Sequence, residues 1–478
     1  MPEQYPLEPS KSDMNAMGRL VLDHVVEVLE SVGERPVRNM PTGADLRRIS
    51  EDFLTAPPQE AGELVNLLAR LRRATLAAEE KGSPGNFSYM PSGGLFSSAL
   101  GEFYARGTNR YGGVAFASPG LIALEESVVR WLAQNVSGLP AGSGGFLTTG
   151  GSMANFSALF TARETLLGPD IGSGTAYVTR HTHHSVVKAA RLAGIRKENV
   201  REVPCGGDLT MDVDQARSMI KVDKEAGLRP FLIVGTAGTT DTGAIDPLTD
   251  IATVAAEHDL WFHVDGAYGG LFRLTDRGRN RLAGVDLADS VTLDPHKSLF
   301  LAFGTGALLV RDPGRLHTAH NERGSYQQDY LTSDGLPDYS SIGPELSREV
   351  RGLRVWFPLH LHGVTAFRAV LDEKLDLAQS VYDELSQFPL LELPWRPQLS
   401  TVVFRVSSGT GDVNQATRRL LDRINADGRF CLSSTRINGH ETVRICILAH
   451  RTHRDHVAEL VSTIKSCVDT SSPKSRFR

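Results

Sequence analysis

Two ionisable residues follow apolar segments that have the composition of buried strands. Lys297 stands in TLDPHKSLF, where the end of a strand would hold its amine rigidly, and Asp265 closes WFHVD and precedes small residues that leave room for a flat group. A buried, unpaired carboxylate costs free energy, but one that faces a pyridinium nitrogen is paired and keeps the ring an effective electron sink. The two residues are therefore compatible with a flat pyridinium-containing group; the alternatives are a surface lysine and an aspartate that caps a turn.

A glycine-rich turn supplies a candidate anion site. In FLTTGGSMANFSAL, residues Gly150, Gly151 and Ser152 lead into a predicted helix, whose first turn would present free N–H groups and the positive end of its dipole. The segment lacks the lysine of a Walker A loop and the GxGxxG spacing of a dinucleotide fold, which disfavours a nucleotide. The same residues also fit a simple turn with an N-cap.

Three histidines, His181, His183 and His184, lie together in RHTHHSVVKAA at a predicted strand-to-helix junction. Neighbouring side chains on a strand diverge, and no carboxylate or cysteine in this segment would complete a set of metal ligands. We therefore expect no metal here and favour one imidazole that stacks on a flat cofactor.

Strands and helices alternate from about residue 120 to residue 310 and must position these side chains. Such alternation predicts a mostly parallel sheet covered on both faces, with ligands at the carboxyl ends of the strands. The expected helices are 121–136 and one that starts at Met153, and the expected strands are 145–148, AYVT, FLIVG, WFHVD and GALLV.

Three segments are expected along the chain. Residues 1–85 have helical periodicity and are predicted to form an N-terminal arm. Residues 86–365 are expected to form the large domain, which starts within a glycine-rich region, and a helix over 353–375 is expected to bridge it to the next segment. Residues 366–478 form a smaller α+β domain, with strands at TVVFRV and TVRICIL and helices near 376–387 and 414–426.

Composition excludes several classes of protein. The net charge is −5 and the basic residues are scattered, so neither nucleic acid nor an acidic membrane surface is an expected partner. The four cysteines form no CxxC pair, which disfavours a zinc site or a disulfide framework. The first twenty residues have no apolar core of a signal peptide, and no run reaches the roughly 18 apolar residues of a membrane span. We expect a cytoplasmic enzyme.

The order of Gly-Gly-Ser, His, HVDGAYGG and DPHK resembles the group II pyridoxal 5′-phosphate (PLP)-dependent amino acid decarboxylases of the aromatic-L-amino-acid decarboxylase type. The resemblance covers nearly the whole chain and implies the PLP fold type I, a homodimer with shared active sites, and an amino acid substrate. By this similarity Lys297 binds PLP as the internal aldimine, Asp265 pairs with the pyridine nitrogen, and His183 stacks on the ring.

The resemblance also implies the surroundings of the cofactor. Ala267 must be small because it packs beneath the ring, and Thr240 lies near the ring hydroxyl. Asp294 stands where the family often has asparagine, and a carboxylate beside a phosphate would repel it. The cofactor-binding residues expected besides Lys297, Asp265 and His183 are Gly151, Ser152, Thr240, Ala267 and His296.

DYSSIGPELSREVRGLRVWF resembles the mobile catalytic loop of the family, and Tyr339 falls on the tyrosine that returns a proton after CO₂ leaves. Relatives with phenylalanine there are thought to yield an aldehyde, so the tyrosine favours plain decarboxylation. The alternative is a loop tyrosine that docks on the surface.

The last set of residues is the one expected to contact the substrate. Gly112 and Gly113 in NRYGGVAFASP stand where the family has bulky pocket walls, which suggests an enlarged pocket, and no partner for a catechol or indole is evident. The expected substrate-side residues are Phe87, Pro91, Ser92, Gly112 and Gly113.

The predicted function is PLP-dependent decarboxylation of an L-amino acid or an amino-acid-containing conjugate through an external aldimine and a quinonoid. One alternative is decarboxylation-coupled oxidative deamination or β-elimination of an S-cysteinyl conjugate in lincosamide-type antibiotic biosynthesis. Another is a catalytically silent binding or assembly protein, against which the intact Lys297 and Asp265 speak.

Overall fold

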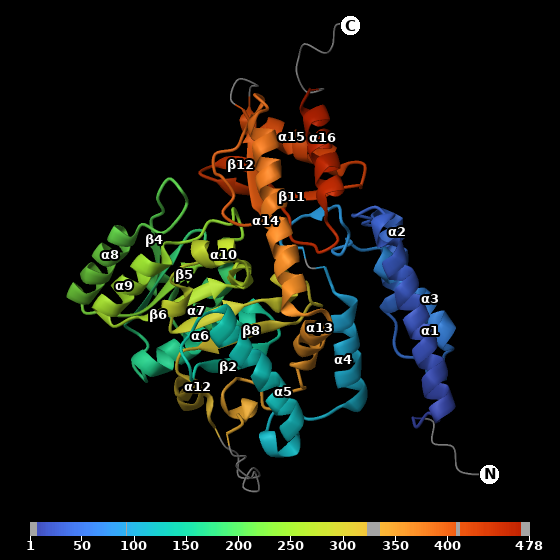
Figure 1. Ribbon diagram of the computed structural model, residues 1–478, viewed down its shortest axis with the longest axis horizontal. Helices are drawn as coiled ribbons and strands as arrows, with labels where there is room; N and C mark the ends of the chain where they lie inside the picture. Colours follow the sequence, from blue (N-terminus) through green and yellow to red (C-terminus); the bar gives the residue numbers. More distant parts are fainter. Residues whose placement is uncertain (1–6, 92, 323–334, 408–411, 470–478) are drawn as a thin grey trace.

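A seven-stranded sheet organises the middle of the chain in the computed structural model, which describes residues 7–91, 93–322, 335–407 and 412–469 (Figure 1). In spatial order its strands are β2 (Gly144–Thr148), β8 (Gly306–Val310), β7 (Ser290–Leu293), β6 (Trp261–Gly266), β5 (Arg229–Thr236), β3 (Gly174–Thr179) and β4 (Val200–Val203). The last five run parallel, and β8 is antiparallel to β2 and β7. The predicted mostly parallel sheet is confirmed.

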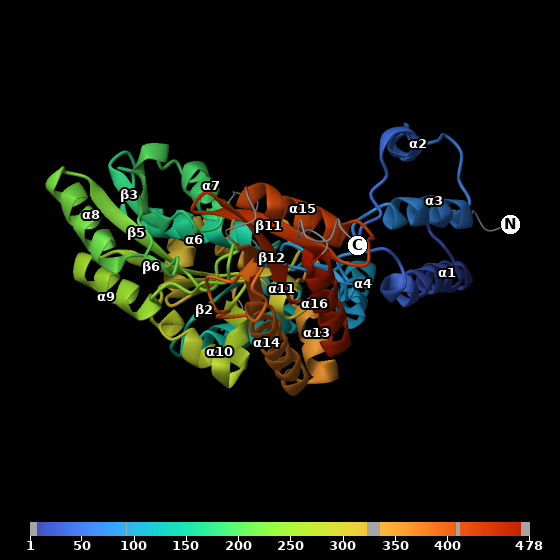
Figure 2. The same cartoon turned by 90° about the horizontal axis from the view of Figure 1, so that it is seen from above.

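Helices cover both faces of this sheet (Figure 2). They are α5 (Pro119–Arg130), which continues as a π-helical segment (Trp131–Val136), α6 (Gly151–Leu166), α7 (His184–Leu192), α8 (Val213–Glu225), α9 (Leu248–His258), α10 (Asp276–Arg281) and α12 (Pro313–His320). The helix predicted from Met153 begins two residues earlier, at Gly151.

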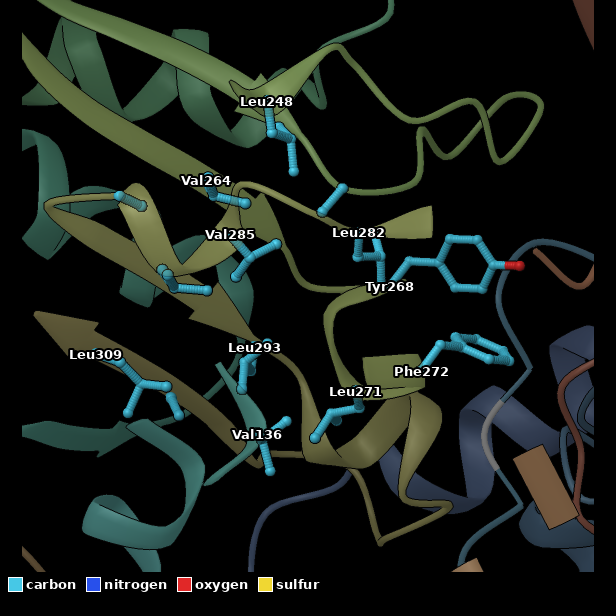
Figure 3. Close-up of a cluster of buried hydrophobic side chains, with 14 of the residues drawn as sticks. Val136, Leu248, Val264, Tyr268, Leu271, Phe272, Leu282, Val285, Leu293 and Leu309 are labelled. Carbon is cyan, nitrogen blue, oxygen red and sulfur yellow. The ribbon is translucent and has the colours of Figure 1, made fainter. Parts of the chain in front are cut away.

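Side chains of β6 alternate between the two faces, because successive residues of a strand point to opposite sides. Phe262 and Val264 belong to the large buried cluster that includes Leu248 of α9, and Figure 3 shows Val264 and Leu248 within it. Trp261 belongs to the cluster on the side of α6 and α7. Asp265, four residues after Trp261 on the strand, therefore faces α6.

A second sheet of five strands packs with the C-terminal helices, in the order β1 (Asn86–Phe87), β11 (Cys431–Ile437), β12 (His440–Cys446), β10 (Thr401–Val406) and β9 (Leu391–Glu392). Its helices are α14 (Val364–Ser386), α15 (Val413–Asn425) and α16 (Arg454–Asp469). The predicted smaller α+β unit is present. The boundaries at 85/86 and 365/366 stay predictions, and β1 joins the start of the large segment to this second sheet.

The single helix predicted over 353–375 is instead two helices. The first, α13 (Leu353–His362), ends at Gly363, whose φ of +74° is a conformation that glycine adopts readily. The second is α14, and the helix predicted near 376–387 is its C-terminal part. α13 packs against α4 (Phe96–Thr108).

The N-terminal arm consists of α1 (Lys11–Glu30), α2 (Gly43–Phe53) and α3 (Leu64–Leu76), which lie to one side of the two sheets (Figures 1 and 2). A capping box at Ser10 and Asp13 starts α1. None of the three helices buries a residue within the described chain. Across the described ranges, no helix is long and apolar enough to cross a membrane.

Candidate active site

A cavity of about 380 Å³ opens beyond the carboxyl ends of β5, β6 and β7. Open sheets of this kind bind ligands at such edges. All eight residues predicted to bind the cofactor line it: Gly151, Ser152, His183, Thr240, Asp265, Ala267, His296 and Lys297. Residues far apart in the sequence thus meet at one site.

Lys297 lies in α11 (Pro295–Ser298), a short helix that directly follows β7. Its Nζ is 3.0 Å from Oδ2 of Asp294, whose side chain is buried. The other oxygen of Asp294, Oδ1, has no hydrogen-bond partner among the described residues. Asp294 is therefore a counter-ion for the lysine amine, which explains how a carboxylate is tolerated where the family often has asparagine.

Asp265 is buried at the end of β6 and faces the cavity. Its Oδ1 accepts a hydrogen bond from the backbone N–H of Ala267 at 3.1 Å, and its Oδ2 accepts one from Nδ2 of Asn155 at 3.0 Å. Two donors hold this carboxylate in one orientation, as a partner for a pyridine nitrogen requires.

His183 caps the N-terminus of α7, and its Nδ1 accepts the backbone N–H of Ser185 at 3.3 Å. Burial lowers the pKa of His183, although the charge of Asp265 opposes the shift. The imidazole is therefore neutral at pH 7. His181 instead points to Asp241, with its Nδ1 3.3 Å from the carboxylate. Within the described ranges, no group of three histidine, cysteine or acidic side chains could hold a metal ion.

The N-terminus of α6 supplies the predicted anion site. Gly150 and Gly151 line the cavity, and a Cβ on Gly151 would lie 2.9 Å from Oδ2 of Asp294 and 3.2 Å from Cβ of Ala267. The backbone can approach a ligand closely only because this position has no side chain. An amine, a carboxylate, a neutral imidazole and a helix N-terminus around one cavity are the groups that PLP needs, so the residues fit this cofactor.

The four substrate-side residues that the structure describes, Phe87, Pro91, Gly112 and Gly113, do not line this cavity within one chain. Phe87 is fully buried in β1, with its ring 6.2 Å from that of Phe430, and Pro91 is also buried. Ser92 lies outside the described residues.

Gly112 and Gly113 pack closely within this chain, and the enlarged pocket inferred from them stays a prediction. A Cβ on Gly112 would lie 2.7 Å from the backbone of Glu349, and one on Gly113 would overlap the hydroxyl of Tyr111. Close packing of the 111–113 segment against residues 346–350 requires both glycines.

Tyr339 is not brought to Lys297 within one chain. Its ring is buried beneath the guanidinium of Arg348 at 4.5 Å, and its hydroxyl donates to Oε2 of Glu126 at 3.4 Å. Burial and the nearby Glu125 and Glu126 raise the pKa of Tyr339 well above its usual value. Its predicted role as proton donor stays untested; the sequence also has Tyr326 and Tyr330 in the 323–334 segment, which lies outside the described residues.

Four residues of the site were not predicted in the roles they have: Asn155, Ser185, His263 and Asp294. Asn155 lies one helical turn after Gly151, so both occupy one face of α6, and His263 precedes Asp265 by two residues on one face of β6. This spacing was the available signal for the polar layer behind the cavity.

Comparisons with known proteins agree with this geometry. A family model described as the pyridoxal-dependent decarboxylase conserved domain matches residues 50–407. The chain is 28% identical over 471 residues to an aromatic-L-amino-acid decarboxylase from Bacillus atrophaeus, with 98% of each chain covered.

Two crystal structures have the same fold. One is of Oryza sativa TDC with PLP and tryptamine, at a TM-score of 0.92 and 25% identity, covering 98% of this chain and 99% of the other. The other is of Rhodiola rosea 4-hydroxyphenylacetaldehyde synthase, at a TM-score of 0.90 and 25% identity, with the same coverage.

Proposed function

Because the chain belongs to the pyridoxal-dependent decarboxylases, and so is a PLP-dependent carboxy-lyase, we propose that it removes the α-carboxyl group of an L-amino acid, or of a conjugate that contains one, as CO₂ and releases the amine. The observation that carries the proposal is the convergence of Lys297, Asp265 and His183 on one cavity. Bound PLP supplies the electron sink for the pair left behind when CO₂ departs.

Each of the residues around the cavity has a separate role in the proposed reaction. Lys297 would hold the carbonyl carbon of PLP with its amine, and the buried Asp294, 3.0 Å from that amine, would be its counter-ion. Asp265, fixed by two N–H donors, would keep a proton on the pyridine nitrogen. The neutral His183 would pack against the ring without placing a second positive charge beside it. The first turn of α6 would hold the phosphate.

Aromatic amino acids are the first substrates to test, because relatives of this chain include enzymes named tryptophan decarboxylase and tyrosine decarboxylase. We propose decarboxylation-coupled oxidative deamination as the second candidate reaction, since other relatives are named 4-hydroxyphenylacetaldehyde synthase and phenylacetaldehyde synthase. In that reaction O₂ and water are consumed, and aldehyde, CO₂, ammonia and hydrogen peroxide are formed. A bulky S-cysteinyl conjugate has less support, because the packing within the chain by itself requires Gly112 and Gly113 to be small.

Product analysis tests the proposal. The holoenzyme is incubated with a panel of L-amino acids and S-cysteinyl conjugates, and CO₂, amine, ammonia, peroxide and pyruvate are quantified together. We expect CO₂ and amine in equal amounts. Ammonia with peroxide would establish the aldehyde-forming reaction, pyruvate would establish elimination, and no turnover of any compound would favour a binding protein.

We further propose a cytoplasmic homodimer. The helices α1 to α3 bury no residue within the described chain and expose large apolar side chains, and exposed apolar surface of this extent is typical of an interaction site. These side chains include Met17, Leu20, Val21, Val25, Leu46, Leu67 and Leu71. Light scattering should give twice the 52.0 kDa mass of one chain, and a monomeric mass would contradict the proposal.

A further inference from the structure

A buried carboxamide lies directly behind the cavity. Asn155 of α6 is 1% exposed and uses both ends of its amide. Its Oδ1 is 2.7 Å from the hydroxyl of Thr292 and 3.1 Å from Nε2 of His263, and its Nδ2 is 3.0 Å from Oδ2 of Asp265 and 3.0 Å from the hydroxyl of Ser185. Two acceptor positions and two N–H groups are thus all occupied, which is the full capacity of the side chain.

The orientation of this amide follows from the chemistry of its neighbours. Were the oxygen and nitrogen exchanged, the amide oxygen would face the carboxylate of Asp265, which as an anion can only accept hydrogen bonds. The N–H groups of Asn155 must therefore point to Asp265 and Ser185, and its oxygen to His263 and Thr292.

The hydrogen bonds on one side of Asn155 have a fixed direction. Nε1 of Trp261 can only donate, and it does so to the hydroxyl of Ser290 at 2.8 Å. Burial lowers the pKa of His263 to about 4, so the ring is neutral and has a single N–H. Because Oδ1 of Asn155 can only accept, this N–H is on Nε2, and Ser290 donates its own hydrogen to Nδ1 at 2.8 Å.

The other side of Asn155 has a fixed direction as well. The backbone N–H of Ser185 donates to Nδ1 of His183 at 3.3 Å, so this nitrogen is an acceptor. The hydroxyl of Ser185, which accepts from Nδ2 of Asn155, therefore donates its own hydrogen to the same Nδ1 at 2.7 Å. The proton of the neutral His183 must therefore be on Nε2.

We infer that Asn155 is a positioning residue, which aligns the carboxylate of Asp265 and, through Ser185, the imidazole of His183 toward one cofactor ring. The inference rests on the proposed function, in which these two groups contact PLP. Without the amide, Asp265 loses the hydrogen bond to Oδ2, and the hydroxyl of Ser185 is free to turn away from His183.

The first test replaces the amide by an apolar group of similar volume, Asn155→Leu, in the PLP-loaded enzyme. Lys297 is unchanged, so the absorption band near 400 nm should remain. A hydrogen bond to a charged group corresponds to a loss in kcat of roughly 10-fold to 100-fold, with KM nearly unchanged. The acid limb of the kcat profile and of the absorption band should move to higher pH, because the carboxylate has lost a donor that favours its charged form.

A second variant, Asn155→Asp, gives a pH signature that a purely structural role would not. At pH 8 it places another carboxylate beside Asp265, so kcat should fall below that of Asn155→Leu and recover as the pH decreases and the new carboxyl group is protonated. The titratable groups bonded to this position are Asp265 and His263 on β6. His183, which Ser185 links to it, is in turn subject to the charges of Asp265, Lys297, His184 and Asp294.

The matched control is Thr161→Val on the same helix. Thr161 is equally buried, but its hydroxyl bonds the carbonyl of Ser157 and the ring of His320, away from the cavity. This variant should keep the wild-type kcat and pH profile.

A measurement on the wild-type holoenzyme does not depend on how the variants fold. With ¹⁵N-labelled histidine, NMR should report the proton of His183 on Nε2, and a proton on Nδ1 would overturn the inference. So would an Asn155→Leu enzyme with wild-type kcat and pH profile, while the wild type still binds PLP and releases CO₂. A wild-type protein that takes up no PLP would overturn the proposed function, and the inference with it.

Discussion

Substitution of Gly151 by alanine places one methyl group at the tightest point of the proposed phosphate site. The new Cβ would lie 2.9 Å from Oδ2 of Asp294 and 3.2 Å from Cβ of Ala267. Neither neighbour moves freely, because Asp294 is 3% exposed at its side chain and pairs with Lys297 at 3.0 Å, and Ala267 is buried against Asp265.

Overpacking of this kind costs about 1–3 kcal/mol. The strain is greatest where the ligand must approach the backbone of α6, so the effect on cofactor binding should be at least as large as that on folding. A loss of 1–3 kcal/mol corresponds to roughly 5-fold to 150-fold weaker PLP binding.

The assay is a titration of the apoenzyme with PLP, followed by the absorption band near 400 nm, together with a thermal melt. Gly120→Ala is the matched control, because Gly120 lies in the first turn of α5 and a Cβ there would meet no atom within 4 Å. Helix propensity predicts that this control is neutral or slightly stabilising. Equal PLP affinity of the Gly151→Ala enzyme and the wild type would refute the reasoning.

Three further predictions concern the surroundings of the cavity. Tyr339→Phe removes a hydroxyl that donates a hydrogen bond to Glu126. We expect a loss of stability of about 1 kcal/mol and unchanged amine formation. Ammonia and peroxide among the products would instead assign the predicted proton transfer to Tyr339. Arg348→Ala leaves Glu125, which is 0% exposed, without its ion-pair partner. Chemical denaturation should show that the free energy of unfolding falls by about 3–5 kcal/mol. A decrease below about 1 kcal/mol, which is the result expected for the exposed control Arg217→Ala, would contradict the role of this pair. Burial lowers the pKa of His320 to about 4. As the pH falls from about 6.5 toward 4, His320 is therefore protonated in the unfolded chain but not in the folded chain, and the stability of the folded chain declines. The pH dependence of the melting temperature should be shallower in His320→Leu, and an identical dependence would show that His320 does not contribute.

Sequence reasoning located the cofactor-facing residues because each follows a strand or starts a helix. Lys297, Asp265 and His183 come after apolar segments of the parallel sheet, and the carboxyl ends of such strands meet at one edge. The glycine-serine turn reaches the same cavity because it starts α6, and its role as an anion site stays a prediction.

The polar layer behind the cavity was not predicted, because it depends on contacts between faces of different elements. Asn155 looks like an ordinary helical residue until α6 packs on β6 and brings its amide to Asp265. The packing of Gly112 and Gly113 was not predicted for the same reason. A Cβ on these glycines would meet the backbone of Glu349 or the hydroxyl of Tyr111 in the same chain, contacts that the sequence does not indicate.

The loop argument for Tyr339 used position in the chain alone. Nothing in the sequence indicates that Arg348 covers its ring or that Glu126 accepts its hydroxyl hydrogen. Burial of a polar side chain is a tertiary property, so a motif can give the neighbourhood of a residue without its environment.

Reductive trapping of the cofactor tests the central claim most directly. The PLP-loaded enzyme is treated with sodium borohydride, digested and analysed by mass spectrometry for a pyridoxyl group joined to a lysine. We predict a single modified residue, Lys297 of α11, the short helix that follows β7. A pyridoxyl group on another lysine, or none at all in an enzyme that still releases CO₂, would contradict the account.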